Sequence, residues 1–133
     1  MADVERHVFT YAIMPHGGDW REGGVVREGY KLNQPMYALA GGQEGKCFSY
    51  ASAGPDNIVL ETVKRAENGQ GTVLRLYESE NALTRARVRL PQGTSRAWSC
   101  NLLEERESEL AVGPDGCVEL RVKPYEVVTI LCE

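Results

Sequence analysis

The side chains best suited to chemistry in this 133-residue chain gather in one glycine-rich loop. Residues 16–24 place His16, Asp19, Trp20 and Arg21 among four glycines. Glycine at this density predicts a surface loop, and imidazole, carboxylate, indole and guanidinium groups on such a loop are typical of ligand and protein contacts. We therefore take these four residues as candidates for the rim of a substrate site or for a contact between domains.

The same loop also has a simpler interpretation, in which its glycines satisfy turn geometry and Trp20 packs over the edge of a sheet. A hard cation held by His16, Asp19 and Glu22 is a weak alternative, because three ligands on one loop would have no partner elsewhere. The chain has two histidines, His7 and His16, so a histidine-rich metal site is excluded. The sequence predicts no metal site in this chain.

No catalytic motif is visible elsewhere in the sequence. The hydrolase elbow Gly-x-Ser-x-Gly and the zinc-protease spacing His-Glu-x-x-His are absent. Cys47 stands where a phosphate-binding loop needs a hydroxyl side chain after Lys46. Glu104, Glu105 and Glu107 form a run of carboxylates, but a charge run in a loop is usually solvated. We predict no catalytic residue in this chain.

The amino-acid composition argues against two classes of binding partner, nucleic acids and membranes. Nineteen acidic residues outnumber fifteen basic ones, and the formal net charge of −4 argues against nucleic-acid binding, which needs a basic surface. No apolar run approaches the roughly 20 residues that cross a bilayer, and no export signal is visible at the amino terminus. The four cysteines are far apart, which favours free thiols: Cys47, Cys100, Cys117 and Cys132. We expect no nucleic-acid partner and no membrane segment.

The elements that must position the loop are strands. Two segments rich in β-branched and apolar residues flank Glu67–Gly71 within Ile58–Tyr77, which predicts a hairpin. His7–Met14 has few polar positions on either face, which predicts a strand interior to a sheet. Val25–Leu32 is compatible with one or two helical turns or with a short strand.

The segment Leu83–Leu90 has the cleanest alternation in the chain and predicts a half-buried strand. Its polar face carries three arginines, Arg85, Arg87 and Arg89. Such a face fits an anionic partner, or it fits cross-strand pairing with carboxylates such as Glu61, Glu78 or Glu119. We favour cross-strand pairing, because the chain as a whole is acidic.

Further strand-like segments complete the pattern: Cys47–Ser52, Ser95–Leu103, Cys117–Lys123 and Tyr125–Cys132. About eight such segments, spaced by roughly 8–12 residues and without a convincing amphipathic helix, predict an all-β fold, an antiparallel β-sandwich over residues 1–133. A closed barrel is the second possibility. Trp98 is expected in the core or between the sheets.

Several of these stretches together resemble one known family. His7–Trp20 and Val25–Pro35 are similar to the carboxy-terminal β-sandwich region of glycoside hydrolase family thirty-eight, the α-mannosidases, whose counterparts read like Phe-x-Tyr-Ala-Leu-x-Pro-His-x-Gly and Tyr-x-Leu-Asn-x-Pro. Later stretches look like the successive terminal strands of the same family: Val59–Glu67, Leu74–Glu78, Asn101–Glu105 and Lys123–Val127. The resemblance covers nearly the whole chain in the right order.

The resemblance implies a partner outside this chain. Enzymes of that family are retaining exo-mannosidases whose aspartate nucleophile and divalent metal, usually zinc, lie in an amino-terminal α/β domain, and nothing in this chain matches the motifs of that domain. The chain thus resembles the carboxy-terminal fragment of a larger α-mannosidase. The implied partners are the N-terminal catalytic domain of the same polypeptide and, through the parent enzyme, a mannoside substrate. The similarity to short soluble α-mannosidases and the free cysteines imply a cytoplasmic location.

Three functional hypotheses follow. The first is an accessory domain that packs on the catalytic domain and brings the loop of His16 and Arg21 to the rim of the mannose site. The alternative is a carbohydrate-binding β-sandwich module that stacks sugars on exposed aromatic rings, with four candidates: Trp20, Tyr30, Tyr37 and Tyr50. The third is an interaction domain whose arginine face binds an acidic partner. The second is weaker because aromatic residues are 8% of the chain and several must fill the core.

Overall fold

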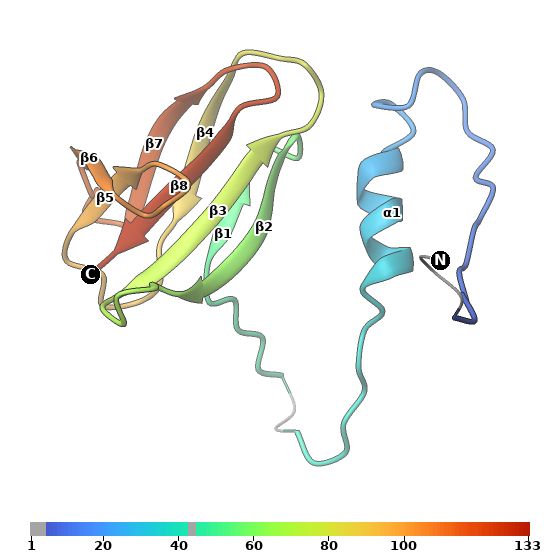
Figure 1. The fold of residues 1–133 in the computed structure, drawn as a ribbon, viewed down its shortest axis with the longest axis horizontal. Helices are drawn as coiled ribbons and strands as arrows, with labels where there is room; N and C mark the ends of the chain where they lie inside the picture. Colours follow the sequence, from blue (N-terminus) through green and yellow to red (C-terminus); the bar gives the residue numbers. More distant parts are fainter. Residues whose placement is uncertain (1–4, 43–44) are drawn as a thin grey trace. The chain divides into compact units, whose positions relative to one another are not determined.

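The computed structural model of the protein describes residues 5–42 and 45–133. The chain divides into two units, residues 1–41 and residues 42–133. All eight strands of the described residues belong to the second unit, and the helix α1 (Val25–Asn33) belongs to the first (Figure 1). The predicted antiparallel sandwich of about eight strands is confirmed, but it lies within the second unit and does not take in all of residues 1–133.

The strands form two antiparallel sheets. One has three strands in the order β1-β4-β7, and the other has five in the order β2-β3-β8-β5-β6. Their bounds are β1 (Ser52–Gly54), β2 (Ile58–Arg65), β3 (Thr72–Glu78), β4 (Thr84–Arg89), β5 (Ala97–Cys100), β6 (Arg106–Leu110), β7 (Cys117–Val122) and β8 (Val127–Cys132).

Aliphatic side chains from both sheets form the main core. Leu74 and Leu76 of β3 and Ile130 of β8 belong to the same buried cluster as Val88 of β4 and Val118 of β7. Strand alternation explains the arrangement, because every second residue of β3 and β8 faces the other sheet. Val73 of β3 and Leu131 of β8 face the other way and join Ala66 and Cys100 in a second, smaller buried cluster on the outer face of the five-stranded sheet.

The central hairpin is confirmed. β2 pairs with β3 in antiparallel register from Ile58↔Glu78 to Arg65↔Thr72. Gly71 is required in the turn, because it has a φ of +87° and a Cβ atom there would lie 2.4 Å from the carbonyl oxygen of Cys132. The turn therefore lets β3 begin close against the end of β8.

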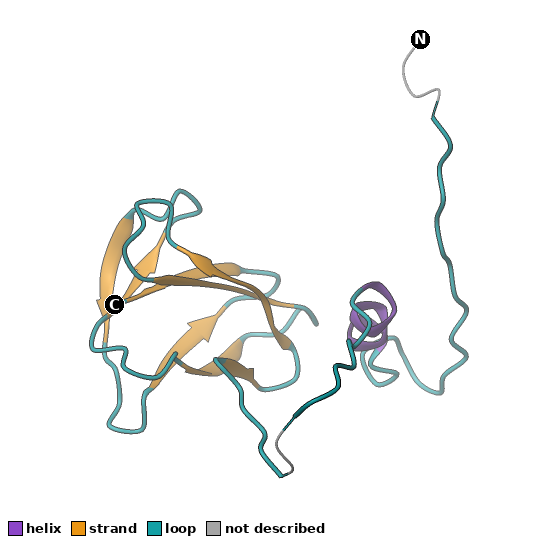
Figure 2. Ribbon diagram, turned by 90° about the horizontal axis from the view of Figure 1, so that it is seen from below, coloured by secondary structure: helices purple, strands orange, loops and turns teal. Residues whose placement is uncertain are grey.

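Two strand predictions were wrong. The structure has no strand in His7–Met14, which Figure 2 draws as an extended loop, and only the last residue of Cys47–Ser52 belongs to a strand. An extended segment becomes a strand only when a neighbour takes up its backbone N–H and C=O groups. β4 supplies that neighbour only to Ser52–Gly54. The undecided Val25–Leu32 segment is helical.

Candidate functional site

The loop that carries the four candidate residues folds as a compact turn before α1. The Asp19 carboxylate accepts hydrogen bonds from the backbone N–H groups of Arg21 (2.8 Å) and Glu22 (3.1 Å). In return, the Glu22 carboxylate accepts one from the N–H of Asp19 (3.2 Å). The backbone bonds from Glu22 and Arg21 lower the pKa of Asp19. Both carboxylates therefore act on backbone geometry, in the manner of a capping box.

The other three candidate side chains are held by equally local contacts. His16 Nδ1 lies 3.1 Å from the carbonyl oxygen of Gly17, and a Cβ atom at Gly23 would lie 2.6 Å from the imidazole ring. The Arg21 guanidinium stands over the Trp20 ring, 5.3 Å from its centroid. The structure thus brings His16, Asp19, Trp20 and Arg21 into one turn, and their role at a substrate rim stays a prediction.

The role of Glu22 in this turn was not predicted, although the Asp-x-x-Glu spacing of Asp19 and Glu22 indicates it. The described residues contain no group of three His, Cys, Asp or Glu side chains that could hold a metal ion. The zinc that the family resemblance implies belongs to a catalytic domain outside this chain, and its place there stays a prediction.

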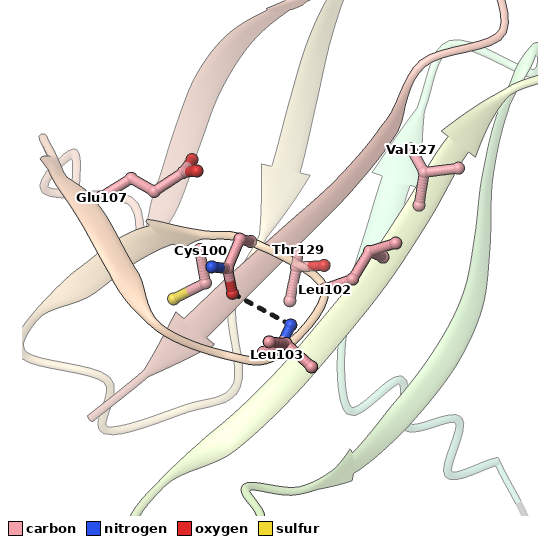
Figure 3. Close-up of a pocket in the computed structure, with 7 residues that line it drawn as sticks. Cys100, Leu102, Leu103, Glu107, Val127 and Thr129 are labelled. Carbon is pink, nitrogen blue, oxygen red and sulfur yellow. Dashed lines mark hydrogen bonds between the residues drawn. The ribbon is translucent and has the colours of Figure 1, made fainter.

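The second unit has a pocket of about 470 Å³ on the outer face of the five-stranded sheet (Figure 3). Residues of β5, β6, β8 and the β5–β6 loop line it: Cys100, Asn101, Leu102, Leu103, Glu107, Val127 and Thr129. Figure 3 shows the loop with Leu102 and Leu103 crossing the strands beside Thr129. The pocket therefore lies between a loop and a sheet face.

Asn101 organises the loop over the pocket. Its side-chain oxygen accepts hydrogen bonds from the N–H groups of Leu103 (2.9 Å, dashed in Figure 3) and Glu105 (3.0 Å). Its side-chain nitrogen donates to the Glu105 carboxylate at 2.7 Å. These bonds fix the backbone of the loop in a conformation that leaves the side chains of Leu102 and Leu103 exposed.

Glu104 fastens the same loop to the central hairpin. Its carboxylate pairs with Lys64 Nζ at 2.7 Å and accepts the N–H of Glu67 at 2.8 Å, while its side chain is only 8% exposed. The hydrogen bond from Lys64 lowers the pKa of Glu104. The prediction that this run of carboxylates is simply solvated is therefore wrong for Glu104, because the β5–β6 loop brings it within reach of Lys64 on β2 of the same sheet.

One carboxylate and one thiol lie among the residues that line the pocket. Retaining glycosidases place two carboxyl groups about 5–5.5 Å apart, whereas Glu107 is the single carboxylate among the lining residues. Burial raises the pKa of the Cys100 thiol, which disfavours the nucleophilic thiolate. The lining therefore combines three aliphatic side chains, Leu102, Leu103 and Val127, with a single carboxylate.

Of the two places predicted for Trp98, in the core or between the sheets, the structure has it against a small buried cluster and not between the sheets. It packs against the small outer cluster, and the guanidinium carbons of Arg96 and Arg106 stand 4.7 and 4.9 Å from its ring centroid. Arg96 is fixed by an ion pair with Glu109, and Arg106 by one with Glu133. The indole is thus covered by two arginines on the outer face of the sheet.

Glu78 is a fully buried carboxylate whose role the sequence did not reveal. Burial acts to raise its pKa, but hydrogen bonds from the N–H groups of Tyr125 (3.0 Å) and Glu80 (2.7 Å) and from the Asn57 amide (2.9 Å) outweigh burial, so the pKa is lowered. Every bond joins it to a turn at the ends of the strands. Glu78 is therefore a structural anchor.

The carboxylates expected to pair with the β4 arginines are mostly elsewhere. Glu61 and Glu78 lie on β2 and β3 of the other sheet, so cross-strand pairing with them is wrong. Glu119 does stand opposite Arg87 in the register, yet the ion pair of Arg87 is with Asp115. Sequence alternation gave the face of each side chain but not the order of the strands.

The aromatic candidates for sugar stacking are divided between the units. Trp20, Tyr30 and Tyr37 belong to the first and Tyr50 to the second. Tyr50 is held by a hydrogen bond to Thr72 (3.1 Å). In the part of the chain that the structure describes, no helix has the length and apolarity needed to cross a membrane.

Comparison with known proteins gives consistent matches. The family model described as the glycosyl hydrolases family 38 C-terminal beta sandwich domain matches residues 57–130. Alpha-mannosidase 2C1 of Homo sapiens is 35% identical over 137 residues, which cover 98% of this chain and 13% of that protein. The Mus musculus protein of the same name is 36% identical with the same coverage. Alpha-mannosidase G of Dictyostelium discoideum is 32% identical over 138 residues, 96% of this chain and 12% of that protein.

The family model and the relatives match different lengths of this chain. The family model matches part of the second unit, whereas the match to each mammalian relative covers 98% of the chain and so takes in the first unit as well. The chain spans 13% or less of the length of these three relatives.

Proposed function

Because this chain belongs to the family 38 glycosyl hydrolase C-terminal β-sandwich domains, we propose that it is the accessory carboxy-terminal domain of a retaining α-mannosidase. The parent enzyme hydrolyses terminal α-D-mannosides in its N-terminal catalytic domain, and this chain packs on that domain and stabilises it. The small share of each relative that the chain spans supports this proposal. So does the lack of a paired carboxylate site in the pocket.

The observation that carries the proposal is the exposure of the apolar segment 7–14. Val8, Phe9, Tyr11 and Ile13 are between 80% and 87% exposed, although their pattern is that of a strand from the interior of a sheet. Burying one such side chain stabilises by about 1.5–3 kcal/mol, and contiguous exposed apolar surface is typical of interfaces. We infer that segment 7–14 is covered by the upstream part of the polypeptide.

A replacement experiment tests this function. In the human Alpha-mannosidase 2C1, the segment that matches this chain is replaced by it, and a second protein lacks that segment altogether. We expect the chimaera to hydrolyse a chromogenic α-mannoside and the shortened protein to lose activity or soluble expression. Undiminished activity and thermal stability in the shortened protein would refute the accessory role.

Three substitutions in the chimaera sharpen the test. Phe9→Asp and Ile13→Asp place charges in the proposed contact and should lower the yield of folded enzyme, whereas Lys31→Ala, on the exposed side of α1, should not. Thermal unfolding of the purified chimaeras reports the loss. Equal stability of all three variants would show that segment 7–14 stays in solvent.

The role of the glycine-rich loop at the substrate rim is tested in the same protein. His16→Ala and Trp20→Ala should raise KM for the α-mannoside while leaving thermal stability unchanged. A matched control, Gln34→Ala, changes an exposed residue outside the loop. If KM stays at the wild-type value in both loop variants, the loop only completes the turn that precedes α1.

We further propose that the metal, zinc or another divalent ion, resides in the catalytic domain outside this chain. Addition of zinc or cobalt should restore the activity of a metal-stripped chimaera and should give the 133-residue chain none. Activity of the isolated chain with either metal would mean that it holds a complete catalytic site.

A cytoplasmic location is proposed for the parent enzyme. Cys47 is exposed, and the other three cysteines are buried: Cys100, Cys117 and Cys132. All four are free thiols, which suits a reducing compartment. Cell fractionation of the tagged full-length polypeptide checks the location. Recovery in a secretory compartment with paired cysteines would contradict it.

The carbohydrate-binding alternative has one observation in its favour, the Tyr37 ring, which is 89% exposed and free to stack on a sugar. Calorimetric titration of the 133-residue chain with mannose and mannobiose tests it. A heat of binding that is measured for the wild-type chain and absent for Tyr37→Ala would support this alternative. No heat of binding at millimolar ligand would refute it.

A further inference from the structure

The outer face of the three-stranded sheet carries four arginines. β4 exposes Arg85, Arg87 and Arg89 at alternate positions, and β7 exposes Arg121 beside them. We call these four residues the arginine face. Sequence analysis found the β4 arginines but not Arg121, because the β4–β7 pairing depends on tertiary structure.

Charges on this face are not balanced by its neighbours. In the register of β4 and β7, Arg85 stands directly opposite Arg121. Like charges in direct cross-strand pairs are destabilising. Glu119 stands opposite Arg87 in the register, and Asp115 forms an ion pair with the same arginine. Among the ion pairs of the described residues, none includes Arg85, Arg89 or Arg121, so positive charge collects on this face although the chain has a net charge of −4.

The side of the face toward β1 is open. Ser52 is the partner of Arg89 and Gly54 the partner of Arg87, and a Cβ atom at Gly54 would meet nothing within 4 Å. Small side chains on the neighbouring strand leave the guanidiniums accessible from above the sheet. A ligand can therefore lie along β4 without displacing a bulky side chain.

We propose that the arginine face binds a short, extended, acidic polypeptide segment. Alternate side chains of any extended strand are about 6.6 Å apart. Arg85, Arg87 and Arg89 therefore have the same spacing as carboxylates at every second residue of an extended peptide. Planar guanidiniums suit carboxylates, which they bind with two parallel hydrogen bonds. The Arg85 and Arg121 pair together faces the same incoming carboxylate.

A short peptide fits better than a nucleic acid. The positive excess is confined to one small face, and a polyanion that extends past it meets a chain with more acidic than basic residues. An extended segment of about five residues spans the three β4 arginines. This site goes beyond the accessory role, and its test uses the 133-residue chain without a catalytic domain.

Fluorescence anisotropy with a labelled Glu-Ser-Glu-Ser-Glu-Ser-Glu peptide at 50 mM salt tests the site. We expect saturable binding to the wild-type chain that weakens with added salt, and no binding of the matching Gln-Ser peptide. The double variant Arg85→Gln, Arg121→Gln should weaken binding about tenfold or more. The control Arg6→Gln, Lys46→Gln removes equal charge from exposed positions off the face and should leave the affinity within about twofold.

Several outcomes would overturn the assignment. They are no binding at millimolar peptide, equal binding of the Gln-Ser peptide, and equal weakening by the two double variants. Tighter binding of duplex DNA or heparin, lost in the same arginine variant, would replace the peptide by a polyanion. Arg89→Gln provides a single-site variant that keeps the Arg85 and Arg121 positions intact and should give an intermediate loss.

Discussion

Segments 7–14 and 83–90 are both predicted from the sequence to be strands, and only the second is one in the structure. Residues 84–89 form β4, with Ala86 and Val88 completely buried between alternating exposed arginines. Segment 7–14 has no strand, and Phe9 and Ile13 are exposed. The difference teaches that a strand-like run of side chains shows a capacity to form a strand, and that a neighbouring strand decides whether the strand forms.

The neighbours of β4 are identifiable. β7 pairs with all six of its residues and β1 with three of them. These ladders take up the backbone N–H and C=O groups that an isolated extended segment leaves to water. Segment 7–14 therefore has the side chains of an interior strand without a ladder of its own in residues 5–42 and 45–133.

The largest expected contrast comes from one substitution made in both units. Ile130→Ala removes a fully buried side chain of β8 and should lower the free energy of unfolding by about 2–5 kcal/mol. Ile13→Ala, at 87% exposure, should change it by less than about 0.5 kcal/mol. Urea unfolding of the 133-residue chain measures both. Equal losses would mean that segment 7–14 is part of the cooperative core.

The next contrast compares a buried glutamate, Glu78, with an exposed one, Glu28. Glu78→Gln keeps the shape but turns the amide nitrogen toward an N–H donor, so one donor loses its acceptor and stability should fall by about 2–3 kcal/mol. Glu28→Gln, on the exposed surface of α1, should leave the unfolding midpoint unchanged. If the two variants unfold alike, the hydrogen bonds of Glu78 contribute nothing.

The pH dependence of stability follows from the same carboxylate. The pKa of Glu78 lies below its ordinary value of 4.5 in the folded state, so the unfolded chain takes up its proton first as the pH falls. The stability contributed by Glu78 is present above pH 4.5 and is lost as the pH falls through the lower folded pKa. Wild type and Glu78→Gln should therefore differ most at neutral pH and converge in acid. A constant difference from pH 7 to pH 3 would contradict this assignment.

Sequence analysis predicted what depends on near neighbours. The Ile58–Tyr77 hairpin and the alternation of β4 were correct, because turn chemistry and a period of two residues are local. The ion pair of Glu104 with Lys64 and the pairing of Arg85 with Arg121 were not predicted, because each depends on the order of strands. For the candidate site, the residue set was found but the mutual bonds of Asp19 and Glu22 were not.

Removal of the first unit should have a smaller effect than either core substitution. A protein that starts at Lys46 keeps all eight strands and the main core cluster. We expect its thermal midpoint to lie within about 2 °C of that of the full chain. A loss of the cooperative transition would show that residues 1–41 complete the sandwich, and the contrast between the two units would then fail.

The smallest expected change in stability comes from a substitution on the arginine face that should affect stability and peptide binding in opposite directions. Arg121→Glu converts a like-charge pair with Arg85 into an opposite-charge pair, which should raise the free energy of unfolding by about 0.2–1 kcal/mol. The same change should abolish binding of the Glu-Ser peptide, because it puts a carboxylate where the ligand places one. A variant that is more stable and no longer binds shows that the arginines are arranged for a ligand at the expense of the sheet. A less stable variant would show that Arg121 has a structural partner and that the face is not a binding site.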